Sequence, residues 1–248
     1  MSVCLGTLTY SLKPLYKILN HMKLSEILKI KKGITCVIGG GGKTTLIHTL
    51  ADELKEKGKV VITTTTHILK SERFHNVITD GKCDLSYLGE IISQHNCICL
   101  GSRFEGDKLS APLIELYDLC SICDYVLVEA DGSKHLPLKS HLAYEPIIPD
   151  KNNKTILVLG IDALDCRVKD VVHRYEKFCE LVGCDENDTL ISDMISALLR
   201  AENLHDTVVI NKCDTDELKK SAQFISSKID EECIISSLLK GEWYVSSN

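Results

Sequence analysis

A run of four glycines is followed by a lysine and two threonines, a combination that can bind phosphate. Glycines let a backbone wrap closely enough for successive N–H groups to point at phosphate oxygens. A lysine at this position can reach the β- and γ-phosphates of a nucleotide, and the next hydroxyl can ligate Mg²⁺. The candidate phosphate-binding residues are Gly39, Gly40, Gly41, Gly42, Lys43, Thr44 and Thr45, with Thr44 also a candidate metal ligand.

Two carboxylates follow a second apolar stretch further along the chain. Residues 125–128 have the pattern of a buried strand, and Glu129 and Asp131 come directly after it. Carboxylates beside a phosphate loop can position Mg²⁺ or its waters. We rank the two equally, expect at least one in the metal shell, and take them with Lys43 as the candidate catalytic residues. The alternative is an acidic loop without a metal.

A third motif, Asn211-Lys212-Cys-Asp214, follows the strand pattern of residues 207–210. It matches the N-K-x-D motif with which GTP-binding proteins recognise the base. The Asp214 carboxylate can accept hydrogen bonds from N1–H and the exocyclic amine of guanine, which adenine does not present. Lys212 would pack its aliphatic stem over the base. The motif predicts GTP, with ATP as the alternative.

Other polar residues are expected near the same site. Thr65 and Thr66 end a strand pattern, and Asp162 follows another. A proline-rich loop at about 134–150 cannot be helix or central strand throughout, and it carries Lys134, His135, Lys139 and His141. We interpret these residues as a lid or substrate-binding element. The alternatives are threonines that only favour a strand and a solvated charged loop.

The segments around these motifs predict the fold. Residues 34–38 form a strand pattern before the glycines, and apolar residues recur at helical spacing from Leu46 to Leu54. The usual phosphate loop has glycine where Val37 stands, and the Lys-Thr-Thr form is closer to the SIMIBI branch of P-loop proteins. The alternative, a glycine-rich turn that binds nothing, is disfavoured by this strand–helix context. We predict a doubly wound α/β domain with a mostly parallel sheet of about seven strands, helices on both faces, and the motifs on one sheet edge.

Composition narrows the classes of partner. The net charge is −6 and there is no basic block, so nothing favours nucleic acid. No apolar run approaches the ~20 residues of a membrane span. Twelve cysteines in a chain that is neither short nor loop-rich favour a cytoplasmic protein over a secreted disulfide scaffold. We expect residues 1–22 to be a poorly ordered extension and residues 23–248 to be a single nucleotide-binding domain that contains the proline-rich loop.

Together these motifs resemble the YqeC family, over about residues 23–245. The blocks that carry the resemblance are the glycine loop, Thr63 to Thr66, Glu129-Ala-Asp-Gly-Ser-Lys134, Glu145-Pro-Ile-Ile-Pro149, Gly160-Ile-Asp-Ala-Leu164, His173-Arg174 and Asn211-Lys-Cys-Asp214. That family is described as an accessory protein of selenium-dependent molybdenum hydroxylases. The resemblance implies a cytoplasmic P-loop protein that acts with such a hydroxylase or its maturation machinery.

These observations predict Mg²⁺-dependent binding and slow hydrolysis of a nucleotide. No residue is an obvious catalytic base, which suits a switch-like or partner-activated NTPase. One alternative is an ATP-using kinase or ligase acting on a small molecule, and another is a non-hydrolysing carrier or scaffold that holds selenium or a cofactor through cysteines. The sequence leaves the oligomeric state open, a dimer included.

Overall fold

The computed structural model describes residues 16–18, 22–81 and 84–246. Its strands are β1 Tyr16–Ile18, β2 Gly33–Gly39, β3 Val60–Thr64, β4 His67–Leu69, β5 His75–Thr79, β6 Cys97–Arg103, β7 Lys108–Ser110, β8 Tyr125–Glu129, β9 Leu138–Lys139, β10 Asn152–Gly160, β11 Val172–His173, β12 Thr207–Asn211, β13 Glu232–Ser237 and β14 Glu242–Ser246. Its α-helices are α1 Leu24–Ile27, α2 Lys43–Leu54, α3 Leu85–His95, α4 Val168–Val171, α5 Tyr175–Val182, α6 Ser192–Glu202 and α7 Asp216–Ser226. Short 3₁₀ turns cover Asp118–Ser121, Ile161–Ala163 and Leu238–Lys240.

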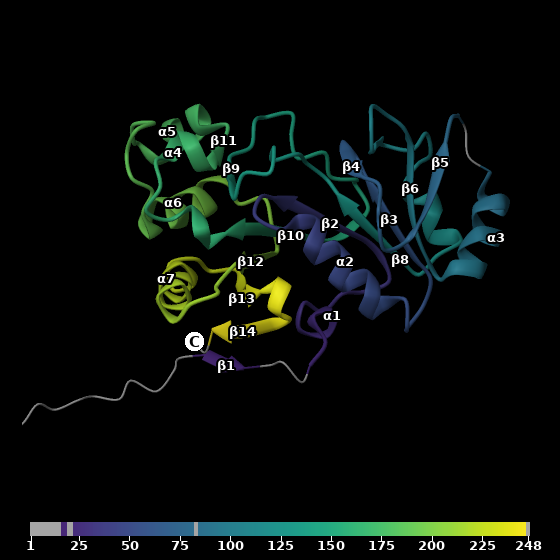
Figure 1. Ribbon diagram of the computed structural model, residues 1–248, viewed down its shortest axis with the longest axis horizontal. Helices are drawn as coiled ribbons and strands as arrows, with labels where there is room; N and C mark the ends of the chain where they lie inside the picture. Colours follow the sequence, from purple (N-terminus) through teal and green to yellow (C-terminus); the bar gives the residue numbers. More distant parts are fainter. Residues whose placement is uncertain (1–15, 19–21, 82–83, 247–248) are drawn as a thin grey trace, which may run out of the picture.

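Twelve of the described strands form one sheet, which runs across the molecule in Figure 1. Its order is β1-β14-β13-β12-β10-β2-β8-β3-β6-β7-β4, and β5 pairs with β6. The strands from β13 to β6, together with β5, pair in parallel, and the remaining pairings are antiparallel. The doubly wound, mostly parallel α/β class is therefore confirmed. The expected count of about seven strands was too low, because short antiparallel strands extend both edges of the sheet.

Helices cover both faces of the sheet, so its central strands are buried on both sides. In β2, Cys36 and Ile38 pack in one apolar cluster with α3, α5, α6 and α7, and Val37 between them packs in the other with α1 and α2. In β8, Val126 and Leu127 divide between the two clusters in the same way. Strands buried on both faces read as continuous apolar runs, which is the pattern seen in these segments.

The N-terminal residues and the lengths of the helices can be compared with two expectations, a poorly ordered extension over residues 1–22 and the lack of a membrane span. Tyr16–Ile18 pairs antiparallel with β14, so this part of the expected extension joins the sheet edge. The rest of that extension, apart from Met22, lies outside the described residues. No helix in the described part of the chain is long and apolar enough to cross a bilayer.

The proline-rich segment between β8 and β10 packs directly on the glycine loop. The Gly41 N–H donates to the Leu136 carbonyl at 3.3 Å, and the Gly160 N–H donates to the Pro137 carbonyl at 2.9 Å. A Cβ on Gly41 would lie 2.1 Å from the Gly160 nitrogen, and its φ is +68°. The loop therefore needs glycine here both for space and for backbone conformation.

The substitution Gly41→Ala should destabilise the fold by about 1–3 kcal/mol, since it adds a backbone clash and a left-handed alanine. Urea unfolding measures this change. Gly89→Ala is the matched control, because Gly89 lies inside α3 with φ in the ordinary range and its Cβ would meet Ile122 at 3.7 Å. That control should stabilise by up to ~1 kcal/mol. Equal effects of the two substitutions would contradict the packing described here.

Candidate phosphate-binding site

A cavity of about 510 Å³ opens at the carboxyl ends of β2, β3 and β8. The predicted site residues that line it are Gly41, Gly42, Lys43, Thr44, Thr45, Thr66, Glu129, Lys134, His135 and Lys212. Three motifs that are far apart in the sequence therefore meet at one sheet edge. This edge is where open parallel sheets bind their ligands.

The backbone N–H groups in the first half of the glycine loop donate hydrogen bonds within the protein, and those in the second half do not. The N–H groups of Gly39, Gly40 and Gly41 donate to Asp131 Oδ2 (2.9 Å), the Val158 carbonyl (2.9 Å) and the Leu136 carbonyl (3.3 Å). Within the described residues, the N–H groups of Gly42 and of the first turn of α2, Lys43 to Thr45, have no acceptor. These groups face the cavity at a helix N-terminus, where an anion is favoured.

The Lys43 side chain is buried and folds back along its own loop. Its Nζ donates to the Gly39 carbonyl at 2.6 Å and lies 3.1 Å from Asp131 Oδ1 and 3.9 Å from Glu129 Oε1. The lysine that would reach phosphates is therefore held by the two acids predicted to work with it.

Asp131 is enclosed in the protein and has several positive neighbours. Its Oδ2 lies 3.3 Å from Lys139 Nζ and 2.8 Å from His141 Nε2, in addition to the Lys43 contact. Burial alone would raise the pKa of Asp131, but the His141 hydrogen bond and the charges of Lys43 and Lys139 outweigh it and lower the pKa to about 2. Asp131 is therefore ionised, although it has no exposed surface.

His141 links this carboxylate to α6. Its Nδ1 lies 2.7 Å from Glu202 Oε2, and its backbone N–H donates to Glu202 Oε1 at 2.6 Å. Burial opposes the charged form of the imidazole, but the hydrogen bonds to Asp131 and Glu202 outweigh burial and raise the pKa of His141. The His141 ring thus bridges two buried acids, which favour its charged form.

Lys139 was expected to meet a substrate, and the structure places it elsewhere. It is buried, donates to the Gly132 carbonyl at 2.8 Å, and pairs with Glu145 Oε2 at 2.8 Å. Glu145 also pairs with Arg174, which lines the cavity while Lys139 does not. Lys139 therefore holds Asp131 and Glu145 together from behind the cavity wall.

Glu129 and Asp131, ranked equally from the sequence, differ in position. Glu129 lines the cavity, and its Oε2 accepts a hydrogen bond from Thr44 Oγ1 at 3.2 Å. Burial raises the pKa of Glu129, and the charge of Lys43 and the Thr44 hydrogen bond offset this only in part. The carboxylate and hydroxyl that face the cavity together are therefore those of Glu129 and Thr44.

The N-K-x-D loop is joined to the glycine loop through Asn211. Its Nδ2 donates to the Gly41 carbonyl at 2.9 Å, and its Oδ1 accepts the Leu238 N–H at 3.0 Å. Lys212 lines the cavity with its Nζ 2.7 Å from Asp162 Oδ2, so the expected substrate residue Asp162 is its ion-pair partner. Asn211 and Asp214 lie outside the cavity lining.

Asp214 is exposed and lies beside the loop that follows β13. Its carboxylate accepts a hydrogen bond from the Ser237 hydroxyl and lies 3.8 Å from Lys240 Nζ. The carboxylate of the motif is therefore at the surface, near the turn Leu238–Lys240.

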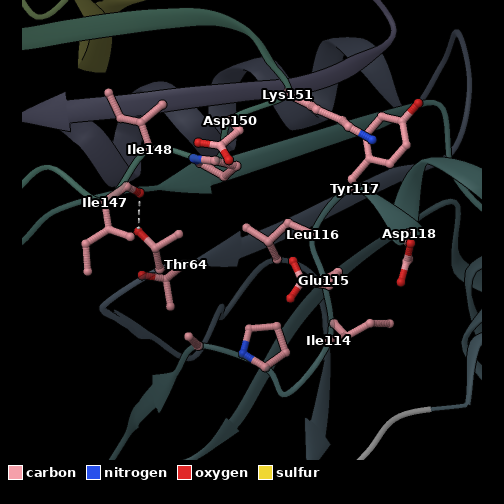
Figure 2. Close-up of a pocket in the computed structure, with 14 residues that line it drawn as sticks. Thr64, Ile114, Glu115, Leu116, Tyr117, Asp118, Ile147, Ile148, Asp150 and Lys151 are labelled. Atoms are coloured by element: carbon pink, nitrogen blue, oxygen red, sulfur yellow. Dashed lines mark hydrogen bonds between the residues drawn. The ribbon is translucent and has the colours of Figure 1, made fainter.

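Thr65 belongs to a second pocket, of about 570 Å³, next to the first. Figure 2 shows Ile147 and Ile148 on one side of this pocket and residues 114–118 on the other. The Thr65 hydroxyl donates to the Ile147 carbonyl at 2.9 Å. Because Glu145 lines the first cavity and residues 147–150 line the second, the proline-rich segment separates the two.

Sequence reasoning missed Glu202 as a residue of the site, and it did not predict the partners of His141 and Arg174. His141 and Arg174 lie in motifs that it identified, but nothing in the pattern distinguishes a buried partner from a solvated one. Glu202 is 71 residues from Asp131 and lies at the end of an amphipathic helix, so no local signal could connect the two.

His141→Gln should destabilise the fold by about 3 kcal/mol or more, because it leaves the buried Glu202 carboxylate without its cation and removes one of the three cations beside Asp131. The pKa of His141 is higher in the folded state than its value near 6.5 in the unfolded state. Its contribution to folding stability is therefore complete below pH 6.5 and is lost as the pH rises through the pKa of the folded state. Urea unfolding should therefore show a larger loss at pH 6 than at pH 9.

His205→Gln is the control, for which we expect the opposite pH dependence of folding stability. Burial lowers the pKa of His205, and neither ring nitrogen has a hydrogen-bond partner among the described residues. Wild-type His205 therefore costs stability as pH falls below about 6.5, and its removal should be less harmful at pH 6 than at pH 9. The same pH trend for both variants would contradict the assigned bridge.

Comparisons with known proteins give the family. The sequence model described as YqeC protein matches residues 35–176. The uncharacterized protein YqeC of Escherichia coli (strain K12) is 32% identical over 173 residues, which cover 67% of each chain. The crystal structure of HypB from Helicobacter pylori in complex with nickel aligns with a TM-score of 0.38 and 14% identity, over 90% of this chain and 88% of that one. That weak likeness adds nothing to the assignment, but the two sequence matches are sufficient: the chain belongs to the YqeC family.

Proposed function

We propose that the chain binds a Mg²⁺–nucleoside triphosphate, with GTP preferred, and hydrolyses it slowly as an accessory factor for a selenium-dependent molybdenum hydroxylase. The observation that carries this proposal is the convergence on one cavity of free N–H groups at the start of α2, Lys43, Thr44 and Glu129. The hydroxylase and its maturation machinery as partner rest on the family resemblance alone, and the cytoplasmic location rests on that resemblance and on the cysteine content.

Lys43 would leave Asp131 and bind the β- and γ-phosphates. A buried carboxylate that loses its cation normally costs about 3–5 kcal/mol. Asp131 retains Lys139 and His141 at 3.3 and 2.8 Å, so its charge stays compensated when Lys43 moves. This surplus of cations around Asp131 supports a lysine that exchanges between an acid and a phosphate.

Thr44 and Glu129 are the residues that fit Mg²⁺. The described residues contain no group of three or more His, Cys, Asp or Glu side chains arranged to hold a metal. Mg²⁺ is commonly bound through one or two protein oxygens, with substrate phosphates and waters completing its shell. A hydroxyl and a carboxylate that share a hydrogen bond and face the cavity meet that need. When bound, Mg²⁺ neutralises charge that develops on the phosphates.

Slow turnover is supported by the partners of the cavity carboxylates. Glu145 pairs with Lys139 and Arg174, and Glu129 accepts from Thr44. Despite burial, the two cations lower the pKa of Glu145 and make it a weak base, and Glu129 would be occupied by Mg²⁺, so hydrolysis would wait for a partner to complete the site.

A carrier that works through the C-x-x-C pair is disfavoured by the burial of these two cysteines. A selenium or cofactor carrier needs an accessible thiolate. Burial raises the pKa of Cys120 and raises that of Cys123 to about 12, so both thiols of the C-x-x-C pair are held neutral.

Lys43→Ala should weaken the binding of a non-hydrolysable nucleotide analogue at least ~100-fold, because it removes the cation at the β- and γ-phosphates. Isothermal titration calorimetry with Mg²⁺ measures this. Lys220→Ala, an exposed lysine on α7, is the charge-matched control and should bind as the parent does. Micromolar affinity retained by a folded Lys43→Ala variant would contradict the assignment.

Asp214→Asn tests the choice of base. The carboxylate matches two donors on guanine, while an amide offers one acceptor and one donor, which match N1–H and the 2-carbonyl of xanthine. The variant should therefore lose GTP and gain XTP by at least ~10-fold in competition binding. Equal binding of ATP and GTP by the unmodified chain would remove the guanine assignment.

A further inference from the structure

We propose that a basic wall of this cavity, formed by Lys134, His135, His173 and Arg174, binds the phosphate group of a second small ligand beside the nucleotide. The inference rests on the proposed function, because it assumes that the glycine loop holds the nucleotide. It assigns a second, phosphorylated small molecule to the same cavity, and it includes no bond-making step.

Backbone conformation singles out this wall. Eight non-glycine residues of the described chain have positive φ, and the four that line the cavity are all basic: Lys134 (50°), His135 (63°), Arg174 (63°) and Lys212 (65°). Of the other four, Asn96 and Asn203 are left-handed caps at helix C-termini, where this conformation is common. Left-handed non-glycine residues away from such caps are costly and cluster at functional sites.

The charge of the cavity is also unusual for this chain. Five lysine or arginine side chains line it against two carboxylates, a formal charge of +3 in a protein of net charge −6. Lys43, Arg174 and Lys212 each have an acidic partner. Lys134 and His135 are exposed and have no hydrogen bond or ion pair to any described residue. The Lys134 charge and the His135 ring nitrogens are therefore left for a ligand.

The pKa of His173 reflects the same excess of positive charge. Burial lowers its pKa, and the charges of Lys139, Arg174 and Lys134 lower it further, with Glu145 only partly opposing them. A dianion among these side chains would relieve the repulsion that they exert on each other.

The wall is fixed relative to the glycine loop. Lys134 and His135 directly precede Leu136, whose carbonyl accepts the Gly41 N–H. β11 pairs with β9 of the same segment, so His173 lies opposite Lys139, and Arg174 directly follows His173. Both halves are therefore attached to the proline-rich segment, which packs on the glycine loop.

The test is a titration of inorganic phosphate followed by NMR of labelled histidine rings. The chain is first saturated with Mg²⁺ and a non-hydrolysable nucleotide, so that the glycine loop is filled. The resonances of His135 and His173, assigned with His135→Gln and His173→Gln, should shift saturably, and chloride at equal ionic strength should not shift them. An absence of a saturable shift, or an equal shift with chloride, would overturn the proposal.

Two single-residue variants test whether phosphate binds at the wall. Lys134→Gln keeps a non-glycine side chain at an exposed position and should weaken phosphate binding about tenfold, the effect of one charged hydrogen bond. Lys220→Ala should leave it unchanged. Equal dissociation constants for these two variants would overturn the assignment of the wall.

Lys43→Ala separates this proposal from the proposed function. Without a nucleotide, phosphate should still shift the two histidines in this variant, because the wall does not need Lys43. Failure of the nucleotide to bind the unmodified chain, with the histidine shifts retained, would reject the proposed function and leave a phosphate site on the wall. Loss of the shifts in a folded Lys43→Ala variant would mean that phosphate binding depends on Lys43, and the wall proposal would fall.

Discussion

The carboxylate of Asp131 has no exposed surface and stays ionised, and much of the site is arranged to meet that requirement. A buried charge is tolerated only when cations and hydrogen-bond donors compensate it. Here these come from Gly39 and Lys43 in the glycine loop, and from Lys139 and His141 in the proline-rich segment. One side chain thus brings together two segments that are nearly a hundred residues apart.

This arrangement links the loop to the rest of the domain. The glycine loop lies against the proline-rich segment and the end of β10, and Asn211 joins it to the N-K-x-D loop. His141 extends the connection to Glu202 on α6, and Glu145 extends it to Arg174. Occupation of the cavity by a nucleotide would change the position of Lys43, and the neighbours of Asp131 would respond first. A partner protein that contacts α6 or the proline-rich segment is therefore well placed to influence the site.

The sequence predicted the parts of the site that depend on strand ends. The glycine loop, Glu129 and Lys212 follow buried parallel strands, and such strands present their ends at one edge. It could not separate Glu129 from Asp131, because both follow β8 and only packing decides that one faces the cavity and the other is enclosed. Lys139 was predicted to contact a substrate because a lysine in a polar loop is normally solvated, and only the packing of the folded chain shows that it is buried. The edge strands β1, β4 and β7 were missed because strands of three residues carry too little pattern.

Hydrogen exchange of the backbone amides from Gly42 to Thr45, followed residue by residue, tests most directly whether this loop holds phosphates. These amides have no acceptor among the described residues, so they should exchange rapidly in the free protein. Saturating Mg²⁺–GTP should slow their exchange at least ~10-fold through new hydrogen bonds to phosphate oxygens, and should do so less for amides of α7. Unchanged exchange at these four amides, with nucleotide bound elsewhere or not at all, would contradict the assignment of a phosphate-binding loop.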